Sequence, residues 1–198
     1  FLSIISVVIS PIVSIASDGA ATMQCAIQKK LASDWVYCIA HVLNRAVRIG
    51  LDHPTVAPLV KAANDISKLF KASPKTAALL EETQTALHLP AKTLKIDNKT
   101  RWSSAHKMMK RLCEARPAVS VCLTSLKRVR QKVPSDLSME GWETLPRLVK
   151  VLEPFKDATK FFSQESVPTI GVVSPIIKRL LDHPLQPVEE EEHDEVIA

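Results

Sequence analysis

Apolar residues recur at the helical period over most of this chain, and this repetition constrains the fold more than any other feature. The apolar stripes fall in residues 34–51, 52–70, 73–88, 102–113, 119–129, 145–162 and 169–181. A helix with one apolar face buries that face against its neighbours. In the first stripe Asn44, Arg45 and Arg48 fall on the polar face, and Pro154 predicts an irregularity in the sixth. Four glycines and 46% hydrophobic residues favour a mainly α protein over a β-sandwich or barrel.

The first part of the chain follows a different pattern. Residues 4–17 are rich in Ile, Val and Ser and end before Asp18, which predicts a buried β-strand and then a turn. A short helix should follow over residues 20–31. Residues 1–16 also resemble a signal-peptide core, but no basic segment precedes them and Pro11 interrupts them. This stretch is shorter than the about 20 apolar residues of a membrane helix, so no membrane partner is expected.

Charge is distributed unevenly along the chain. Residues 92–132 hold twelve Lys and Arg residues and two acids, whereas residues 189–198 hold six acids and no Lys or Arg. A basic segment attracts nucleic-acid phosphates because its binding releases condensed counterions. The acidic end should stay solvated and disordered. We therefore expect DNA to bind weakly to the basic region, with an acidic protein as the alternative partner.

Several short motifs occur along the chain, and their order is informative as well as their residues. Residues 17–23 are similar to T-D-N-A-x-N-M, residues 38–47 to C-x-A-H-x-L-N-L-x-V, and residues 100–104 to T-R-W-N-S. Residues 148–159 and 168–170 are similar to L-x-x-V-L-x-P-F-x-x-A-T and P-T-I. In this order the motifs resemble the hAT superfamily of transposases, of the kind kept in zinc finger BED domain-containing proteins.

The resemblance implies a ribonuclease H-like α/β core that is interrupted by a large helical insertion. On this basis we expect an incomplete ribonuclease H-like element over residues 1–31 and a helical insertion-type domain over residues 32–185. An acidic disordered tail should occupy residues 186–198. In the intact family, acids on the ribonuclease H-like core hold Mg²⁺ or Mn²⁺ for phosphoryl transfer.

Asp18 lies where the family has its second catalytic acid, at the exit of a strand. The residues before Ser17 contain no Asp or Glu, and Glu165 matches a segment of the family that is not catalytic. One carboxylate cannot hold the metal ions of phosphoryl transfer. We therefore expect Asp18 to be vestigial, with no cofactor and no catalysis in this chain alone. The alternative role for Asp18 is a helix N-cap.

Cys38 and His41 are a second candidate pair, three residues apart in one of the family motifs. This spacing can supply half of a zinc site, but no second pair occurs at a useful distance. A buried thiol and a hydrogen-bonded imidazole in the core are therefore expected. The four cysteines form no C-x-x-C pair, which favours a reducing compartment, and the nucleus fits a DNA partner.

Arg101 and Trp102 are the strongest candidates for nucleic-acid contact. The resemblance places this tryptophan near the transposon DNA ends, where an indole can stack on an unpaired base while Arg101 holds a phosphate. Alternatively, Trp102 begins the apolar stripe of its helix and belongs to the core. Lys107, Lys110 and Arg111 point away from that stripe, so they should form a phosphate-facing ridge or a solvated helix face.

Three functions remain open from the sequence. The first is a domesticated or degraded transposase fragment of a nuclear protein, which is inactive alone and binds nucleic acid weakly through residues 92–132. The second is a helical protein-interaction module without DNA binding. The third is a truncated view of an active transposase. A homo-oligomer, formed through the C-terminal region of the family that is missing here, would be a further partner.

Overall fold

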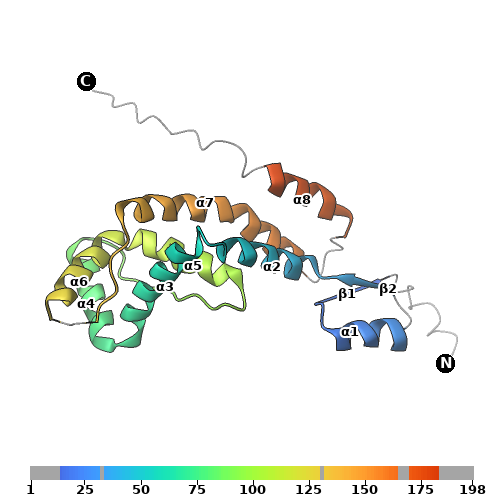
Figure 1. Ribbon diagram of the computed structural model, residues 1–198, viewed down its shortest axis with the longest axis horizontal. Coiled ribbons are helices and arrows are strands. Elements are labelled where there is room, and N and C mark those ends of the chain that lie inside the picture. The colour runs from blue at the N-terminus through green and yellow to red at the C-terminus, as the bar shows by residue number, and fades with distance from the viewer. Residues whose placement is uncertain (1–13, 32–33, 130–131, 165–169, 183–198) are drawn as a thin grey trace, which may run out of the picture. The chain divides into compact units, whose positions relative to one another are not determined.

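Most of the described residues are helical (Figure 1). The computed structural model describes residues 14–31, 34–129, 132–164 and 170–182. The chain divides into two units, of which the first ends at Ser163 and the second begins at Gln164. The expectation of a mainly α fold is confirmed. Within the described ranges, no helix is long and apolar enough to span a membrane.

Some predicted features lie outside the described residues. These are residues 4–13 of the first strand, most of the stretch that resembles a signal peptide, the acidic tail over 186–198 and the domain boundary after residue 185. The boundary after residue 31 stays a prediction.

The described part of the first unit includes two short strands that pair in parallel. Strand β1 (Ser14–Ser17) pairs with β2 (Asp34–Tyr37), with Ser14 opposite Asp34 and Ser17 opposite Tyr37. Helix α1 (Ala21–Cys25) and the π-helical turn η2 (Ala26–Lys30) lie between them in sequence, because parallel strands need a crossover connection. The indole N–H of Trp35 donates to the Ser17 hydroxyl oxygen at 2.8 Å, which ties the two strands together through side chains as well.

Strand β2 replaces the start of the helix that the sequence predicts over residues 34–51. Val36 fits the helical stripe, but Trp35 and Tyr37 beside it are residues that favour strands, and β1 offers them a partner. The pairing continues into Cys38, whose N–H donates to the Ser17 carbonyl oxygen at 2.8 Å. Only the remainder of the stripe forms helix α2 (Ile39–Leu51).

The helices that follow match the predicted stripes, with shifted ends. In the first unit they are α3 (Ala57–Ala72), α4 (Pro74–Ala86), α5 (Trp102–Glu114), α6 (Arg116–Val129) and α7 (Met139–Phe162). Helix α7 runs through Pro154 without interruption, because proline costs a helix one backbone hydrogen bond but its own φ is helical. The described part of the second unit holds the 3₁₀ turn η3 (Ile170–Val172) and helix α8 (Val173–Asp182).

Helix α5 lies at the centre of the first unit. It packs against α2, α3, α6 and α7, and Figure 1 shows it between α3 and α7. Its inward side chains are at most 1% exposed: Trp102, Ala105, Met108, Met109 and Leu112. Burying one large apolar side chain contributes about 1.5–3 kcal/mol to stability. The position of α5 therefore depends on its whole inner face.

A buried histidine joins α5 to α7. His106 is 1% exposed, and its Nε2 lies 2.7 Å from Oε2 of Glu153, which also pairs with Lys156. Burial lowers the pKa of His106 below its usual 6.5, because a charged imidazole would lose its hydration there, while the Glu153 carboxylate opposes this shift. The folded protein therefore favours the neutral imidazole.

We predict that the free energy of unfolding falls as the pH drops below about 6.5, where unfolded His106 takes up a proton that the folded protein resists. Replacing His106 with Gln should flatten this dependence. Urea unfolding of both forms between about pH 5 and pH 8 would measure it.

Glu153 contributes in a different pH range. The pKa of Glu153 is lowered chiefly by its hydrogen bond with Lys156, so its stabilisation is present at neutral pH and is lost only as the pH falls through the carboxylate range. An unchanged pH dependence in the His106→Gln variant would therefore show that another group is responsible.

Candidate nucleic-acid interface

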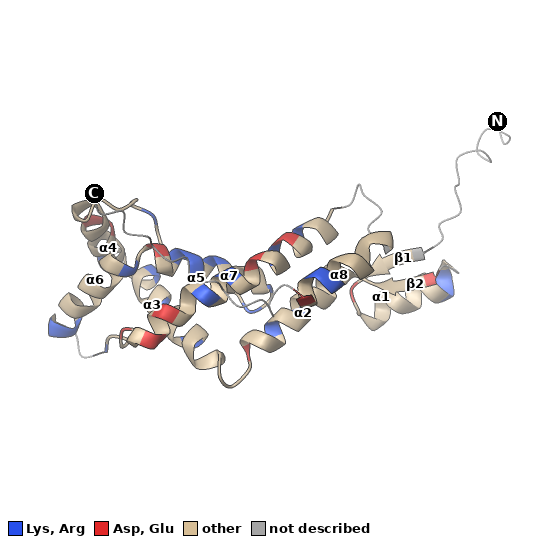
Figure 2. Cartoon of the chain, turned by 90° about the horizontal axis from the view of Figure 1, so that it is seen from above, with Lys and Arg blue, Asp and Glu red and all other residues tan. Residues whose placement is uncertain are grey.

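Exposed cations occur along α5 and just before it. They are Lys99, Arg101, Lys107 and Lys110, called the four cations below. Figure 2 shows basic residues along α5. In the part of the chain that the structure describes, Lys99, Arg101 and Lys107 form no salt bridge. The charge of Lys110 contributes, together with Lys156, to the lowered pKa of Glu153.

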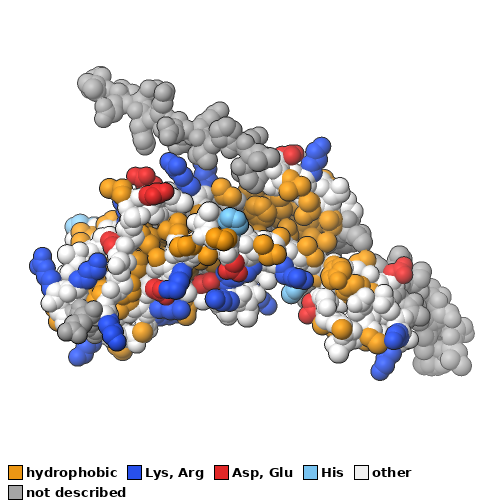
Figure 3. Space-filling model, viewed as in Figure 1, with side chains coloured by type: hydrophobic (Ala, Val, Ile, Leu, Met, Phe, Trp, Pro, Cys, Tyr) orange, Lys and Arg blue, Asp and Glu red, His pale blue; other side chains and the backbone are white. Residues whose placement is uncertain are grey.

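Lys92 and Lys95 are exposed earlier in the same connection, whereas the next cations after α5 lie on α6. The guanidinium of Arg116 lies over the Trp142 ring, 5.4 Å from its centre, and Lys127 and Arg128 lie in the last turn of α6. On the face shown in Figure 3, basic side chains are spread over several elements with acidic side chains among them. The charge of residues 92–132 is therefore divided among separate places.

The segment that carries Lys99 and Arg101 is held by an ion pair with α2. The Arg48 guanidinium donates to both carboxylate oxygens of Asp97, Nη1 to Oδ2 at 3.0 Å and Nη2 to Oδ1 at 2.9 Å. The exposed fractions of the two side chains are 14% and 6%. Arg48 also donates to the carbonyl oxygens of Asn98 at 3.2 Å and Lys99 at 3.3 Å. One arginine thus fixes three consecutive residues, and we call residues 97–101 the anchored segment.

A second residue of α2 fixes the point where the anchored segment becomes α5. The side-chain oxygen of Asn44 accepts the Trp102 N–H at 2.9 Å, and its amide nitrogen donates to the Thr100 carbonyl at 3.3 Å. The first amides of a helix have no partner within the helix, and Arg101 at the N-cap position supplies no side-chain bond. Asn44 therefore takes the place of a local N-cap.

The hydroxyl of Ser104, in the first turn of α5, contacts the anchored segment. It accepts the Asn98 N–H at 2.8 Å, and its single hydrogen has three acceptors within 2.7 Å, which are Asp97 Oδ1 and the carbonyl oxygens of Asn98 and Arg101. From the other side, the Asp97 N–H donates to the Asn64 side-chain oxygen at 3.0 Å. Asp97 thus links α2, α3 and α5 through one residue.

The sequence interpretation missed this network. It placed Asn44 and Arg48 on the solvent face of their helix, which is wrong, because the anchored segment covers that face and needs donors for its carbonyl groups. One signal was present in the sequence. Asp97 is one of only two acids in residues 92–132, and an isolated acid among bases indicates a specific ion pair.

Arg111 does not belong to an exposed ridge, and this prediction is wrong. Its side chain is 7% exposed and turns under the chain that precedes the anchored segment, where Nη2 donates to the Lys92 carbonyl at 2.6 Å. Nη1 pairs with Glu114 at 3.1 Å. The physical reason is that extended backbone crossing a helix leaves carbonyl groups that a buried arginine can satisfy.

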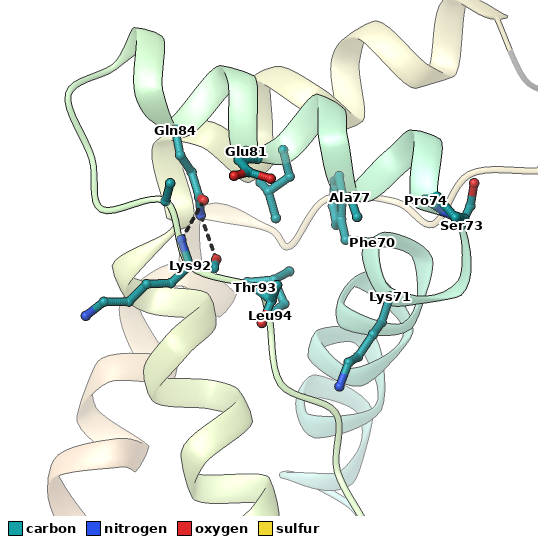
Figure 4. A pocket seen from close by; sticks show the side chains of 12 residues that line it. Phe70, Lys71, Ser73, Pro74, Ala77, Glu81, Gln84, Lys92, Thr93 and Leu94 are labelled. Atoms are coloured by element: carbon teal, nitrogen blue, oxygen red, sulfur yellow. Dashed lines mark hydrogen bonds between the residues drawn. The ribbon is translucent and has the colours of Figure 1, made fainter.

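Gln84 of α4 holds the same crossing chain from the other side. Its side-chain oxygen accepts the Lys92 N–H at 3.1 Å and its amide donates to the Lys92 carbonyl at 3.2 Å (Figure 4). Beside this contact lies a pocket of about 250 Å³ whose lining includes Phe70, Leu80 and Leu94. The chain between α4 and α5 is therefore fixed at Lys92 as well as at Asp97.

Trp102 belongs to the core. Its side chain is 1% exposed, and its ring meets that of His106 edge to face with the centres 6.1 Å apart. Of the two alternatives from the sequence, the structure supports the core position. The indole cannot stack on a nucleic-acid base from there, so Arg101 and the exposed lysines are the residues left to contact a ligand.

Asp18 stands apart from other possible metal ligands. It is exposed after β1, and α1 begins with Ala20 at the N-cap position and no side-chain cap, so the alternative role of Asp18 as a cap is wrong. Within the described ranges, no group of three or more His, Cys, Asp or Glu could hold a metal ion. The carboxylate set that Mg²⁺ or Mn²⁺ would need for phosphoryl transfer does not fit these residues.

Cys38 and His41 also fall short of a site. Cys38 is half-buried at the N-cap position of α2. His41 is exposed on the first turn, so the expectation of a buried imidazole is wrong. Among the described residues, no second ligand pair of the kind that zinc requires completes a group with His41.

Comparison with known proteins gives consistent relatives. Residues 36–151 match the model of the ZBED1 RNase-like helical domain. The human zinc finger BED domain-containing protein 6 is 31% identical over 84% of this chain and 16% of its own length. Its mouse counterpart is 32% identical over 74% of this chain and 14% of its own length. The human zinc finger BED domain-containing protein 4 is 27% identical, over 72% of this chain and 12% of its own length.

The chain therefore spans at most 16% of the length of these relatives. No solved structure matches it significantly.

We predict that replacing Trp102 with Ala lowers the free energy of unfolding by about 3–5 kcal/mol, because it removes a large fully buried ring. The single-stranded DNA affinity of the folded variant should be unchanged. Thermal melting and fluorescence anisotropy well below the midpoint would measure both. Lys107→Ala on the outside of the same helix is the control, with an expected change within about 0.5 kcal/mol. Normal melting with weaker single-strand binding would contradict the core position.

Proposed function

The chain belongs to the family of the ZBED1 RNase-like helical domain, and we propose that it serves as a non-catalytic, transposase-derived part of a nuclear protein that binds nucleic acid weakly. The observation that carries this proposal is the anchored segment, where cations face outward on a backbone that is fixed from inside. The nuclear location rests on the nucleic-acid partner and on the family.

The chemistry of the anchored segment favours phosphates over base edges. The Asn44 side-chain oxygen accepts the Trp102 N–H, and the Ser104 hydroxyl accepts the Asn98 N–H. The Asn98 side-chain oxygen accepts from the Thr100 hydroxyl. Lys99 and Arg101 are left to face outward. Phosphate contacts position a protein on nucleic acid, whereas base-edge hydrogen bonds specify sequence. We therefore propose binding that is independent of sequence.

The number of available cations argues for weak affinity. Each phosphate contact on duplex DNA lowers the slope of log K against log salt by about 0.9, so the four cations give a slope of about −3.6 at most. Acidic side chains among the bases reduce the attraction further (Figure 3). Binding of this kind is measurable at low salt and fades towards physiological salt.

A second function is favoured by a different observation. Val42 and Ile49 of α2 are exposed at 43% and 70%, and they lie two turns apart with the exposed Ala46 between them. An apolar helix face in solvent is typical of a protein-interaction surface. A protein-interaction module is therefore the alternative, and it predicts no salt-dependent affinity for DNA.

We predict that the chain binds a short DNA duplex with a slope of log K against log salt between about −2 and −3.6. Replacing Lys99, Arg101, Lys107 and Lys110 together with Gln should bring the slope close to zero. Fluorescence anisotropy at several salt concentrations would measure it. Replacing Lys127 and Arg128 at the far end of α6 is the matched control and should leave the slope almost unchanged. Absence of binding at low salt would refute the nucleic-acid function.

We predict no cleavage or strand transfer by this chain on DNA with Mg²⁺ or Mn²⁺, because Asp18 is a single carboxylate without a metal-binding group. Gel assays on duplexes with hAT-type transposon ends would test this, with Asp18→Asn as the control. Metal-dependent cleavage that disappears in the Asp18→Asn variant would contradict the proposal.

A further inference from the structure

We propose that Arg48, Asp97 and Ser104 are positioning residues for the nucleic-acid contact, in that they hold the anchored segment in the conformation that presents Lys99 and Arg101 to phosphates. This inference rests on the proposed function and concerns the same surface. None of the three residues needs to touch nucleic acid.

The network uses four of the five N–H groups of Arg48. Its guanidinium donates twice to Asp97 and also to the carbonyls of Asn98 and Lys99, at distances between 2.9 and 3.3 Å. The positive charge of Arg48 is therefore directed at Asp97 and at the backbone of the anchored segment. Its planar fork matches the carboxylate and the backbone together, which a lysine cannot do.

Asp97 joins this fork to α5. Its Oδ1 accepts from Arg48 and lies 2.7 Å from the Ser104 hydroxyl, which accepts the Asn98 N–H and also lies 2.7 Å from the Asn98 and Arg101 carbonyl oxygens. All of these bonds surround the backbone on either side of Lys99. An irregular segment without such bonds would sample many conformations, and binding would then have to restrict it. The network already restricts the segment in the free protein, so binding costs less conformational entropy.

The sign of the effect separates this role from simple electrostatics. Removing the negative charge of Asp97 raises the net positive charge beside the four cations, so electrostatics alone predicts tighter DNA binding. Loss of the anchor predicts weaker binding. The Asp97→Asn variant therefore gives opposite results under the two interpretations.

The control for charge is Asp65→Asn. Asp65 pairs with Lys61 on the exposed side of α3, where the two side chains are 38% and 78% exposed, and it touches no part of the anchored segment in the described structure. This variant removes the same charge without releasing the segment. Its DNA affinity should rise slightly or stay constant.

A charge-neutral variant covers the case in which Asp97→Asn folds poorly. Ser104→Ala removes the hydroxyl that meets Asp97 and Asn98, and it leaves the net charge unchanged. Ser103→Ala, one residue earlier on a half-buried position, is its matched control, since the described structure gives the Ser103 side chain no hydrogen bond. Circular dichroism and melting curves would establish that each variant is folded at the assay temperature.

The experiment is a series of anisotropy titrations with a labelled duplex at about 0.1 M salt. We expect Asp97→Asn and Arg48→Lys to weaken binding about tenfold, which is close to the loss of one phosphate contact, and Ser104→Ala to weaken it about threefold. Ser103→Ala should bind as the unmodified chain does. In a chain that already carries Gln at Lys99 and Arg101, Asp97→Asn should cause no further loss, whereas a general loss of structure would lower affinity again.

The outcomes distinguish the two levels of the proposal. If the unmodified chain binds the duplex through Lys99 and Arg101, but folded Asp97→Asn binds it more tightly and folded Ser104→Ala binds it equally, the positioning role is refuted and the proposed function stands. If the unmodified chain does not bind at low salt, the proposed function fails and the positioning role fails with it.

Discussion

The ion pair between Arg48 and Asp97 is the interaction on which the surface of this protein depends. Both side chains are largely removed from water, and a desolvated pair gains little net stability over apolar packing. What such a pair supplies is orientation, because a fork of two hydrogen bonds admits few geometries. Here that orientation is passed to a segment with no regular structure of its own. Without the pair, only the bonds with Asn44, Asn64 and Ser104 would hold the anchored segment.

Helix α5 serves the core and the surface at the same time. Its inner face carries Trp102 and the buried methionines, and its outer face carries Lys107 and Lys110. Because one helix holds both sets, the packing of its apolar face also fixes the backbone positions of the exposed lysines. Variants of the inner face would therefore change binding only by changing stability. Variants of the outer face change charge alone, which is why the two roles can be separated by experiment.

The sequence predicted the helical content well, since apolar periodicity reports which face is buried. It failed where the decisive partner lies far away in the chain. Strand β2 depends on pairing with β1, and Arg111 is buried because residues 90–93 cross over it. Likewise, Asn44 and Arg48 look like surface residues until the anchored segment covers them. Local patterns identified the basic region, but only tertiary contacts decide which of its cations reach solvent.

Binding and catalysis place different demands on such a surface, so the proposed binding does not require a catalytic site. Attraction between cations and phosphates falls off slowly with distance and tolerates imprecise placement. Phosphoryl transfer with metal ions requires several carboxylates that converge on one point. Lys99 and Arg101 need only a fixed backbone, which Arg48 and Asp97 provide within the helical unit itself. Asp18 would need partner acids that converge on it, and the described residues hold no group of three or more His, Cys, Asp or Glu that could bind a metal ion.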